Sequence, residues 1–356
     1  PAEQDALFPG KQFISTVLEA LETKTRMTGV IAHRYLMRAA MAGMIVAVFY
    51  VVNYAIVGVF DGLRLGDTSL AGIGKMFGAL SFGPALVFIY YTKSELLTSN
   101  MMVVAIGHYY KRISTWRALR VLVMCLAGNF AGGLVFAAMY RFSTLVEAAT
   151  GEQATHSVAA KLHYLSSASG IGDLFVRAVL CNFMINLAML LIYNGFIRED
   201  WSKIFSMIIS VFVFAFLGLE HSVANTVLFT VVGLTHGIDV LPALGNVAVA
   251  LLGNFVGGGL LIGGYYAYSK ELIDGVSVCD FDVTKLSVYT QGIGLTGIEV
   301  YDLLRDEYDI QIEFGDIGNI LAYISIGDRI QDIERLVGAL ADIKRLYSRD
   351  GKDLIA

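Results

Sequence analysis

Six long apolar stretches dominate the first three quarters of the chain. They cover residues 35–60, 70–107, 119–140, 174–196, 204–234 and 240–268. A helix needs about 20 mostly apolar residues to cross the hydrocarbon core of a bilayer. The pattern therefore predicts an all-α membrane domain of six transmembrane helices over residues 35–272, preceded by a polar N-terminal segment, residues 1–34.

Two of these stretches, the second and the fifth, are too long for one crossing, and each contains a polar interruption. Thr-Lys-Ser-Glu at 92–95 interrupts the second, and Gly-Leu-Glu-His-Ser at 218–222 interrupts the fifth. Backbone that leaves a helix at membrane depth needs protein or water to satisfy its N–H and C=O groups. We therefore expect two broken helices that line a cavity.

The membrane domain contains an internal repeat. Gly-Asn-Phe-Ala-Gly-Gly at 128–133 returns as Gly-Asn-Phe-Val-Gly-Gly at 253–258, and segment 95–100 returns at the same offset as 220–225, with its first Glu and last Asn kept. Each copy holds three helices, and an odd number places the two copies in opposite orientations across the membrane. Inverted repeats with breaks at matching positions point to a transport site between the repeats.

His221 is the leading candidate for chemistry in the pore. It begins the second half of the fifth stretch, and Asn225 lies one turn later on the same face. An ionisable residue inside a span is costly to bury and is therefore a functional candidate. Because a helix N-terminus supplies positive partial charge, the position suits an anion. We expect His221 to donate a hydrogen bond or a proton to that anion; the alternative is an imidazole satisfied by backbone carbonyls.

Other polar residues near the breaks have two interpretations each. Thr98 either lines the pore or caps the half-helix that follows it. Lys161, before the fourth stretch, either attracts anions to the outer mouth or is a solvated lysine at the interface. Glu95 and Glu220 are expected to accept bonds from loop N–H groups, a structural role shared by Asn100, because a carboxylate facing the path would repel an anion. Four apolar side chains beside the breaks are expected to narrow the pore: Phe82, Leu86, Leu96 and Phe214.

Composition and charge add an orientation. The chain is 56% hydrophobic and 16% charged, whereas soluble domains carry about 25% charged residues. Few soluble proteins could bury so much apolar surface, and a disordered chain is excluded. Residues 108–120 carry four basic and no acidic residues, and such loops stay in the cytoplasm. Six crossings then place both termini in the cytoplasm of a multi-pass cell-membrane protein, and the split charge argues against a nucleic-acid partner.

The C-terminal segment, residues 276–356, differs sharply from the membrane domain. It holds 8 basic and 15 acidic residues. Apolar residues alternate or recur at helical spacing within it, which predicts strands at 286–291, 310–314 and 320–326 and helices at 297–308 and 331–346. We therefore expect a small soluble α+β module on the cytoplasmic side.

Residues 11–272 resemble the formate/nitrite transporter family. The resemblance rests on the segments 95–100 and 218–225 and on the paired Gly-Asn-Phe-x-Gly-Gly segments. It implies pentamers of six-helix protomers with an aquaporin-like fold that pass small monovalent anions through a lipid bilayer, with formate foremost and nitrite or hydrosulfide as alternatives. Protonation of the anion in the pore would remove most of the cost of crossing the apolar constriction.

The resemblance also implies roles for individual residues. His221 and Asn225 match the family's central pore residues, Thr98 lies on the loop that gates the cytoplasmic side, and Lys161 matches the basic residue of the outer vestibule. The residues at constriction positions are Phe82, Leu86, Leu96 and Phe214. The family's Leu-Phe-Thr at the first break is Leu-Leu-Thr here, so one constriction residue is altered.

The C-terminal segment resembles the carboxy-terminal region of pyridoxal-phosphate-dependent Orn/Lys/Arg decarboxylases, through segments 294–300, 304–308 and 325–329. No Ser-x-His-Lys segment offers a Schiff-base lysine, so the sequence indicates no enzyme, no cofactor and no metal. A docking or regulatory module and an artificial fusion both stay open. A neutral-solute channel of the aquaporin type is a second functional hypothesis, disfavoured because paired Asn-Pro-Ala motifs are missing from the sequence.

Overall fold

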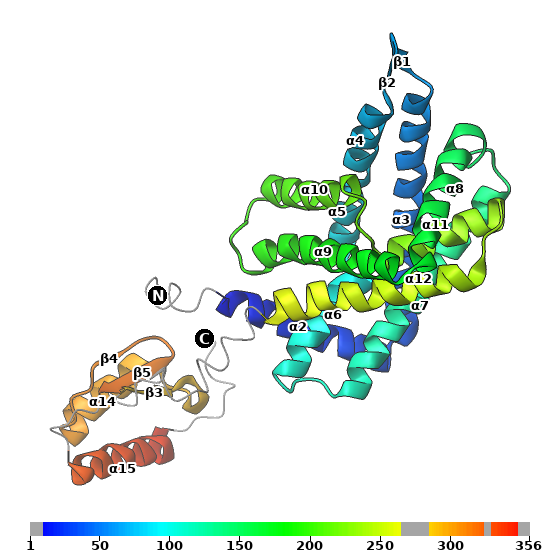
Figure 1. Cartoon of the computed structure of the whole chain (residues 1–356). Helices are drawn as coiled ribbons and strands as arrows, with labels where there is room; N and C mark the ends of the chain where they lie inside the picture. The colour runs from blue at the N-terminus through cyan, green and yellow to red at the C-terminus, as the bar shows by residue number, and fades with distance from the viewer. Residues whose placement is uncertain (1–9, 265–284, 324–328, 348–356) are drawn as a thin grey trace. The chain divides into compact units, whose positions relative to one another are not determined.

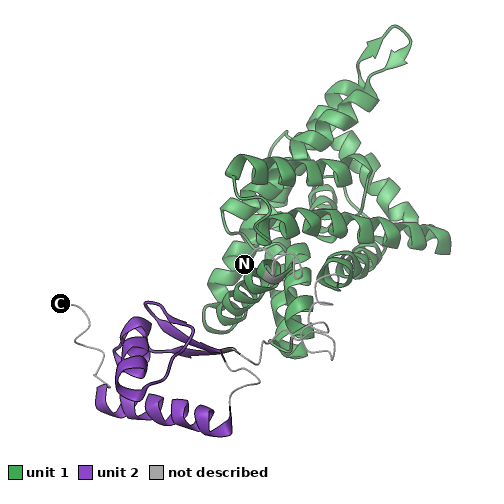
Figure 2. Ribbon diagram, turned by 90° about the vertical axis from the view of Figure 1, so that its left-hand side faces the viewer, with its two compact units in different colours: residues 1–272 green, residues 273–356 purple. Residues whose placement is uncertain are grey.

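The computed structural model describes residues 10–264, 285–323 and 329–347. The chain divides into two compact units, Pro1–Leu272 and Ile273–Ala356 (Figure 2). The first unit is helical apart from a two-stranded hairpin, and the second combines helices with a small sheet. Each unit has a hydrophobic core of its own.

The first unit, which we call the body, is built from helices of very unequal length (Figure 1). Its elements are α2 (Lys11–Val30), α3 (Ala32–Asp61), β1 (Arg64–Leu65), β2 (Thr68–Ser69), α4 (Ala71–Phe82), α5 (Pro84–Tyr91), α6 (Leu97–Tyr109), α7 (Thr115–Arg141), α8 (Ala148–His163), η1 (Tyr164–Ser166), α9 (Ala168–Tyr193), α10 (Asp200–Phe216), α11 (Ser222–Thr235), α12 (Val240–Asn254) and the π-helical η2 (Phe255–Ile262). The hairpin lies at one end of the body, and α2 lies at the other.

Five helical runs of the described chain are long and apolar enough to cross a membrane: Ala32–Asp61, Ala71–Tyr91, Thr115–Arg141, Ala168–Tyr193 and Val240–Ile262. The shorter Ser222–Thr235 is also apolar. The second and fifth stretches are interrupted where the sequence predicts, between α5 and α6 and between α10 and α11. The N-terminal segment, which is polar in composition, contains the helix α2, and this helix packs against α3, α6, α7 and α9.

The two interruptions share a backbone conformation. Lys93 and Gly218 both have left-handed backbone angles, with φ of 55° and 64°. A left-handed residue ends a helix because the chain turns out of the helical path. An arginine holds each turn: Arg38 Nε donates to the Lys93 carbonyl (2.6 Å), and Arg177 Nη1 donates to the Gly218 carbonyl (3.2 Å). Arg38 and Arg177 thus occupy equivalent positions in the two repeats.

The glycines of the repeated segments let the long helices touch. Gly132 of α7 lies so close to α3 that an added Cβ would stand 1.8 Å from the Ala40 carbonyl oxygen. Gly257 approaches α9 in the same way, with its Cβ position 2.0 Å from the Val179 carbonyl oxygen. Any side chain at either position would force the helices apart. The repeated glycines therefore pack helices within one chain, and they pack them alike in both halves.

The second unit, which we call the tail module, is a three-stranded antiparallel sheet with two helices. Its elements are β3 (Lys285–Tyr289), the 3₁₀ turn η3 (Gln291–Ile293), α14 (Gly297–Tyr308), β4 (Phe314–Gly315), β5 (Asn319–Tyr323) and α15 (Ile330–Tyr347), with strand order β3-β5-β4. Thr296 and Glu299 form a reciprocal capping box at the start of α14. Val300, Leu304, Ile320 and Ile343 are fully buried between the helices and the sheet.

The prediction of a strand at 310–314, the second of the three in chain order, is largely wrong. Only Phe314–Gly315 pairs with β5. Asp309 is left-handed (φ 52°), and the N–H of Ile310 donates to the Leu304 carbonyl to complete the end of α14. Ile312 is buried as the alternation predicts, but Phe314, which the same pattern places on the core face, is 48% exposed. The C-terminal part of the third predicted strand and most of segment 325–329 lie outside the described residues.

Asp316 fixes the tight turn between β4 and β5. Its carboxylate accepts bonds from the backbone N–H groups of Gly318 (2.7 Å) and Asn319 (2.6 Å). These two donors hold the pKa of the Asp316 carboxyl below its usual value, because they stabilise the ionised form. The turn is therefore expected to keep its charge at physiological pH.

Candidate pore and its buried charge pairs

A small cavity lies inside the body between the two helix interruptions. Its volume is about 20 Å³, enough for one water molecule. Its walls are Val46, Phe82, Ala85, Leu86, Ile89, Leu96, Ile185, Val211, Phe214, His221 and Ala224. All four residues assigned to the constriction line it, and His221 is its sole polar side chain. The cavity is too small for a hydrated ion, so this conformation is closed.

His221 is held in one orientation. It is the N-cap residue of α11, and its Nδ1 accepts a bond from the N–H of Ala224 (3.0 Å). Its Nε2 lies 3.2 Å from the hydroxyl of Thr98 on α6. Because Nδ1 accepts from a backbone N–H, the neutral ring carries its proton on Nε2. His221 therefore presents an N–H donor where the two half-helices begin.

Thr98 does not cap its half-helix. The N-cap of α6 is Leu96, and that helix has no side-chain cap. The Thr98 hydroxyl instead contacts His221, while the Thr98 carbonyl accepts bonds from the side-chain amides of Asn182 (3.1 Å) and Asn186 (3.3 Å). The capping interpretation is thus wrong, and the structure brings Thr98 and His221 together from opposite repeats.

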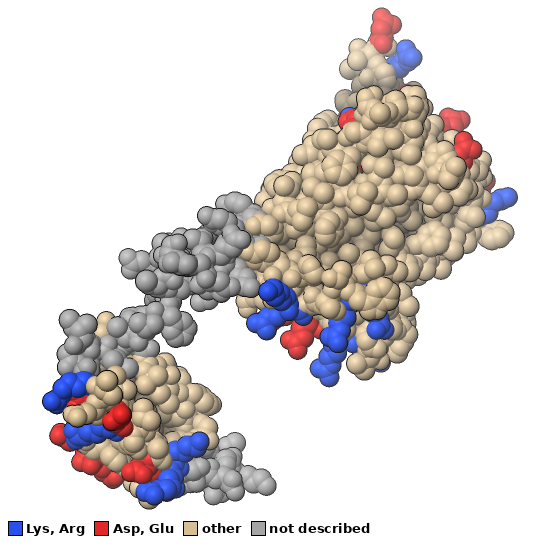
Figure 3. Space-filling model, turned by 60° about the horizontal axis from the view of Figure 1, so that its bottom comes forward, with Lys and Arg blue, Asp and Glu red and all other residues tan. Residues whose placement is uncertain are grey.

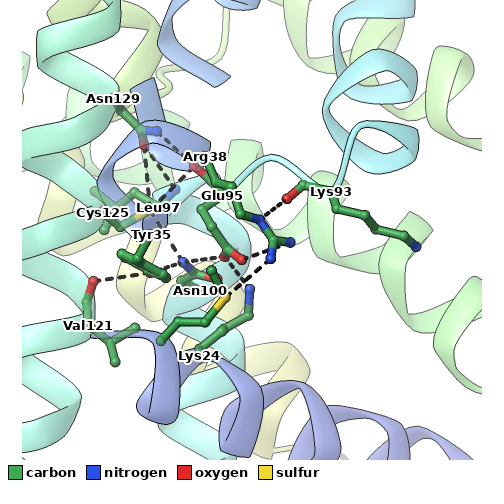
Figure 4. A network of polar contacts seen from close by, with 11 residues as sticks. Lys24, Tyr35, Arg38, Lys93, Glu95, Leu97, Asn100, Val121, Cys125 and Asn129 are labelled. Carbon is green, nitrogen blue, oxygen red and sulfur yellow. Dashed lines mark hydrogen bonds and ion pairs between the residues drawn. The ribbon is translucent and has the colours of Figure 1, made fainter. Parts of the chain in front are cut away.

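Glu95 is buried, and cations surround it (Figure 4). Its carboxylate pairs with Lys24 of α2 and lies 3.4 Å from the guanidinium of Arg38 on α3. Asn100 Nδ2 also donates to it (3.2 Å). The expected bonds to loop N–H groups are therefore replaced by an ion-pair network. Sequence reasoning missed Lys24, which lies 71 residues from Glu95.

Glu220 has matching lysine and asparagine partners in the second repeat. Lys161 of α8 donates to it (2.8 Å), and so does Asn225 Nδ2 (2.5 Å). The Lys161 side chain is 13% exposed, so the interpretation as a solvated lysine is wrong. Asn225 also donates to Asn246 (2.8 Å) and is not among the cavity walls. Lys24 and Lys161 are thus equivalent partners of equivalent carboxylates.

One asparagine ties each interruption to the neighbouring long helices, Asn129 in the first repeat and Asn254 in the second. Asn129 Nδ2 donates to the carbonyls of Ala39 (2.8 Å) and Glu95 (2.8 Å), and its Oδ1 accepts from the N–H of Leu97 (3.1 Å). Asn129 thereby satisfies two backbone groups that the break leaves without helical partners, the Glu95 carbonyl and the Leu97 N–H, and ties them to α3 through Ala39. These are the asparagines of the repeated segments, and the repeat was the signal that identified them.

Asn254 makes the matching bonds in the second repeat. Its Nδ2 donates to the carbonyls of Ala178 (2.7 Å) and Glu220 (3.0 Å), and its Oδ1 accepts from the N–H of Ser222 (2.8 Å). Three equivalent bonds at each of two equivalent positions are strong structural evidence that the sequence repeat is a repeat of structure.

A much larger cavity opens on the α2 side of the body. Its volume is about 700 Å³, and it extends from the α2 surface to Leu96 at the wall of the small cavity. Its charged lining residues are Lys24, Arg38, Lys93, Glu95, Arg198 and Lys203. Five cations and one carboxylate give this vestibule a positive balance, which attracts anions toward Leu96.

Replacing Lys161 by alanine is expected to destabilise the body. Glu220 is 2% exposed, and a buried charge that loses its partner costs about 3–5 kcal/mol. Lys203→Ala removes an equivalent pair with Asp200, but there the carboxylate is 69% exposed, so the expected cost is below about 1 kcal/mol. Thermal unfolding of the purified variants measures both, and equal melting temperatures would contradict the buried-pair assignment. Adding Glu220→Gln to Lys161→Ala is expected to recover part of the loss.

The comparisons with known proteins agree with this arrangement. The family model described as formate/nitrite transporter matches residues 11–268. The chain belongs to the formate/nitrite transporter family. A formate channel of Haemophilus influenzae is 29% identical over 217 residues, which cover 55% of this chain and 75% of that one. A solved pentameric formate channel with formate bound shares the fold, with a TM-score of 0.54 and 20% identity, covering 67% of this chain and 98% of that one.

Membership of the formate/nitrite transporter family makes the body a multi-pass membrane transporter of small anions, and its relatives are transporters and channels rather than enzymes. The tail module matches a different class of protein. An arginine decarboxylase of Halalkalibacterium halodurans is 35% identical over 86 residues, which cover 24% of this chain and 18% of that enzyme. The tail module is therefore similar to a small part of a much larger enzyme.

Proposed function

We propose that the protein carries small monovalent anions across the cell membrane, formate foremost, with the anion protonated in the pore. The observation that supports this most strongly is the position of His221: the sole polar side chain of an apolar cavity that both broken helices meet. Family membership and the formate channel of Haemophilus influenzae support the substrate. Nitrite and hydrosulfide are the alternatives within the same class.

The physical reason for protonation is the cost of an unshielded charge among apolar walls. That cost is about 3 kcal/mol or more at the bilayer centre. An anion that reaches the cavity from the vestibule meets the Nε2–H of His221 and the positive ends of α6 and α11. Formic acid, unlike formate, then passes Leu96 and Phe214 without that cost.

We propose the same assembly for this chain that its structural relative has. Residues 35–272 act as a transport domain of six crossings in two inverted repeats, and five copies form a homopentamer. The matching bonds of Asn129 and Asn254 support the inverted repeat. Basic residues near α2 and the α6–α7 turn support cytoplasmic termini. The tail module then acts as a cytoplasmic docking or regulatory module.

Flux into proteoliposomes tests the proposal. Formate uptake by vesicles that hold the full chain is expected to rise as the external pH falls, because each anion enters with a proton. Counterflow with labelled formate, nitrite and hydrosulfide ranks the substrates. Uptake of glycerol or water without any formate uptake would contradict the proposal and favour the neutral-solute channel. Formate uptake that ignores pH would refute the coupling alone.

A further inference from the structure

A second cavity of about 830 Å³ forms a groove between α2 and the turn that leads into α7. Four arginines line it: Arg26 comes from α2, Arg112 from the turn, and Arg117 and Arg120 from the first turns of α7. All four are exposed. Within residues 10–264, none of them forms an ion pair with a carboxylate. The groove is separate from the pore and shares no lining residue with the vestibule.

The groove also contains groups that bind hydroxyls. Glu19 and Glu22 of α2 line it together with Ser15 and Thr25. The four arginines and two carboxylates leave a net charge of +2. Guanidinium groups bind phosphate oxygens with paired N–H donors, and carboxylates accept bonds from hydroxyl groups. The groove therefore matches a ligand that carries one phosphate and free hydroxyls.

An apolar ridge runs from the groove along α7. Trp116 lies between two of the arginines in sequence and is 75% exposed. Leu119 and Val123 follow at helical spacing and are 48% and 55% exposed. Tryptophan concentrates at the boundary between headgroups and hydrocarbon. In Figure 3, Lys and Arg side chains gather along one edge of the body, next to a broad face with few charges.

We propose that this groove binds the headgroup of an anionic glycerophospholipid, of the phosphatidylglycerol type, from the leaflet on the α2 side. The arginines hold the phosphate diester, Glu19 and Glu22 accept from the glycerol hydroxyls, and an acyl chain lies along Trp116, Leu119 and Val123. The ridge favours a lipid over free phosphate, because an acyl chain packs on an apolar surface and free phosphate does not. Basic pockets at this level of a membrane protein select anionic lipids.

Tryptophan quenching by brominated lipids in nanodiscs tests the proposal on the full chain. The chain has two tryptophans, so Trp201→Phe provides a background in which Trp116 is the only reporter. Phosphatidylglycerol brominated on its acyl chains is expected to quench Trp116 at a several-fold lower mole fraction than brominated phosphatidylcholine. The triple variant Arg112→Gln, Arg117→Gln, Arg120→Gln is expected to lose that several-fold preference, so that both lipids quench at similar mole fractions.

Matched variants separate specific binding from bulk charge. Arg34→Gln, Lys111→Gln, Arg198→Gln removes the same charge from exposed positions on the α2 side outside the groove and is expected to keep the preference. Arg26→Gln alone, on the opposite wall, is expected to weaken it. Equal quenching by both lipids in the starting protein would overturn the proposal. So would a response of Trp116 to inorganic phosphate or polyglutamate in pure phosphatidylcholine, which would indicate a free anion or an acidic protein partner instead.

Discussion

Replacing Asn254 by leucine is expected to prevent stable folding of the body. The change leaves two buried backbone groups of the break without partners, the carbonyl of Glu220 and the N–H of Ser222, and it removes an additional donor to the Ala178 carbonyl, which keeps its bond within α9. Each unsatisfied group costs about 1–3 kcal/mol, so two of them cost roughly 2–6 kcal/mol, a large part of the stability of a typical domain. Size-exclusion profiles and thermal unfolding of the purified protein measure it.

Asn129→Leu is expected to have the same effect, because its three bonds occupy equivalent positions. Thr230→Val provides the control. The Thr230 hydroxyl donates only to the carbonyl of Thr226, one turn earlier in α11, so its loss leaves no new unpaired backbone group. If Asn254→Leu melted within a few degrees of Thr230→Val, the role of the amides in supporting the breaks would be wrong.

Replacing His221 by alanine is expected to reduce formate flux by about tenfold to a hundredfold while the protein still assembles. A hydrogen bond to a charged partner is worth about 1.5–3 kcal/mol, and alanine removes the one polar side chain of the cavity wall. The remaining walls stay apolar, so an anion in transit has no side-chain donor there. Stopped-flow uptake into proteoliposomes, normalised to the amount of folded protein, gives the rate.

Two further variants sharpen this result. His236→Ala removes an exposed histidine whose Nδ1 meets the hydroxyl of Thr235 beyond the pore, and its flux is expected to match the starting protein. Thr98→Val keeps the shape of the side chain but removes the hydroxyl near Nε2, so a smaller loss is expected. Unchanged flux and unchanged pH dependence in His221→Ala would rule out the proposed role of the imidazole.

The positions of the breaks could be predicted because long apolar stretches with polar interruptions have few other solutions in a membrane. The repeat was visible because Gly132 and Gly257 must keep a close approach that no side chain permits. The helical character of α2 was not predicted, although Phe13, Val17 and Leu21 recur at helical spacing and are buried. In the tail module, the alternation at 310–314 predicted too long a strand, because the N–H of Ile310 donates to the Leu304 carbonyl at the end of α14.

The sequence predicted the apolar residues of the candidate pore but not the partners of its buried carboxylates. Phe82, Leu86, Leu96 and Phe214 were placed beside the breaks, and all four line the cavity with His221. The partners of the carboxylates were not predicted, since nothing local links Lys24 to Glu95. The pairing of Lys161 with Glu220 was not predicted either, so the repeat alone gave no reason to place a lysine beside Glu95. Asn225 follows His221 by one turn, yet the two side chains have different partners. Asn225 donates to the Glu220 carboxylate, whereas the His221 ring contacts the Ala224 N–H and the Thr98 hydroxyl.

The equivalent arginines of the two repeats pair with different carboxylates, and the charge at the two ends of the path differs as a result. Arg38 adds its charge to the pair formed by Lys24 and Glu95, whereas Arg177 is neutralised by Asp173 (3.0 Å), away from Glu220. One mouth therefore carries an extra positive charge beside its buried carboxylate, and the other mouth does not. The rate at which anions enter should therefore differ between the two ends at low ionic strength and become more alike once salt shortens the screening length.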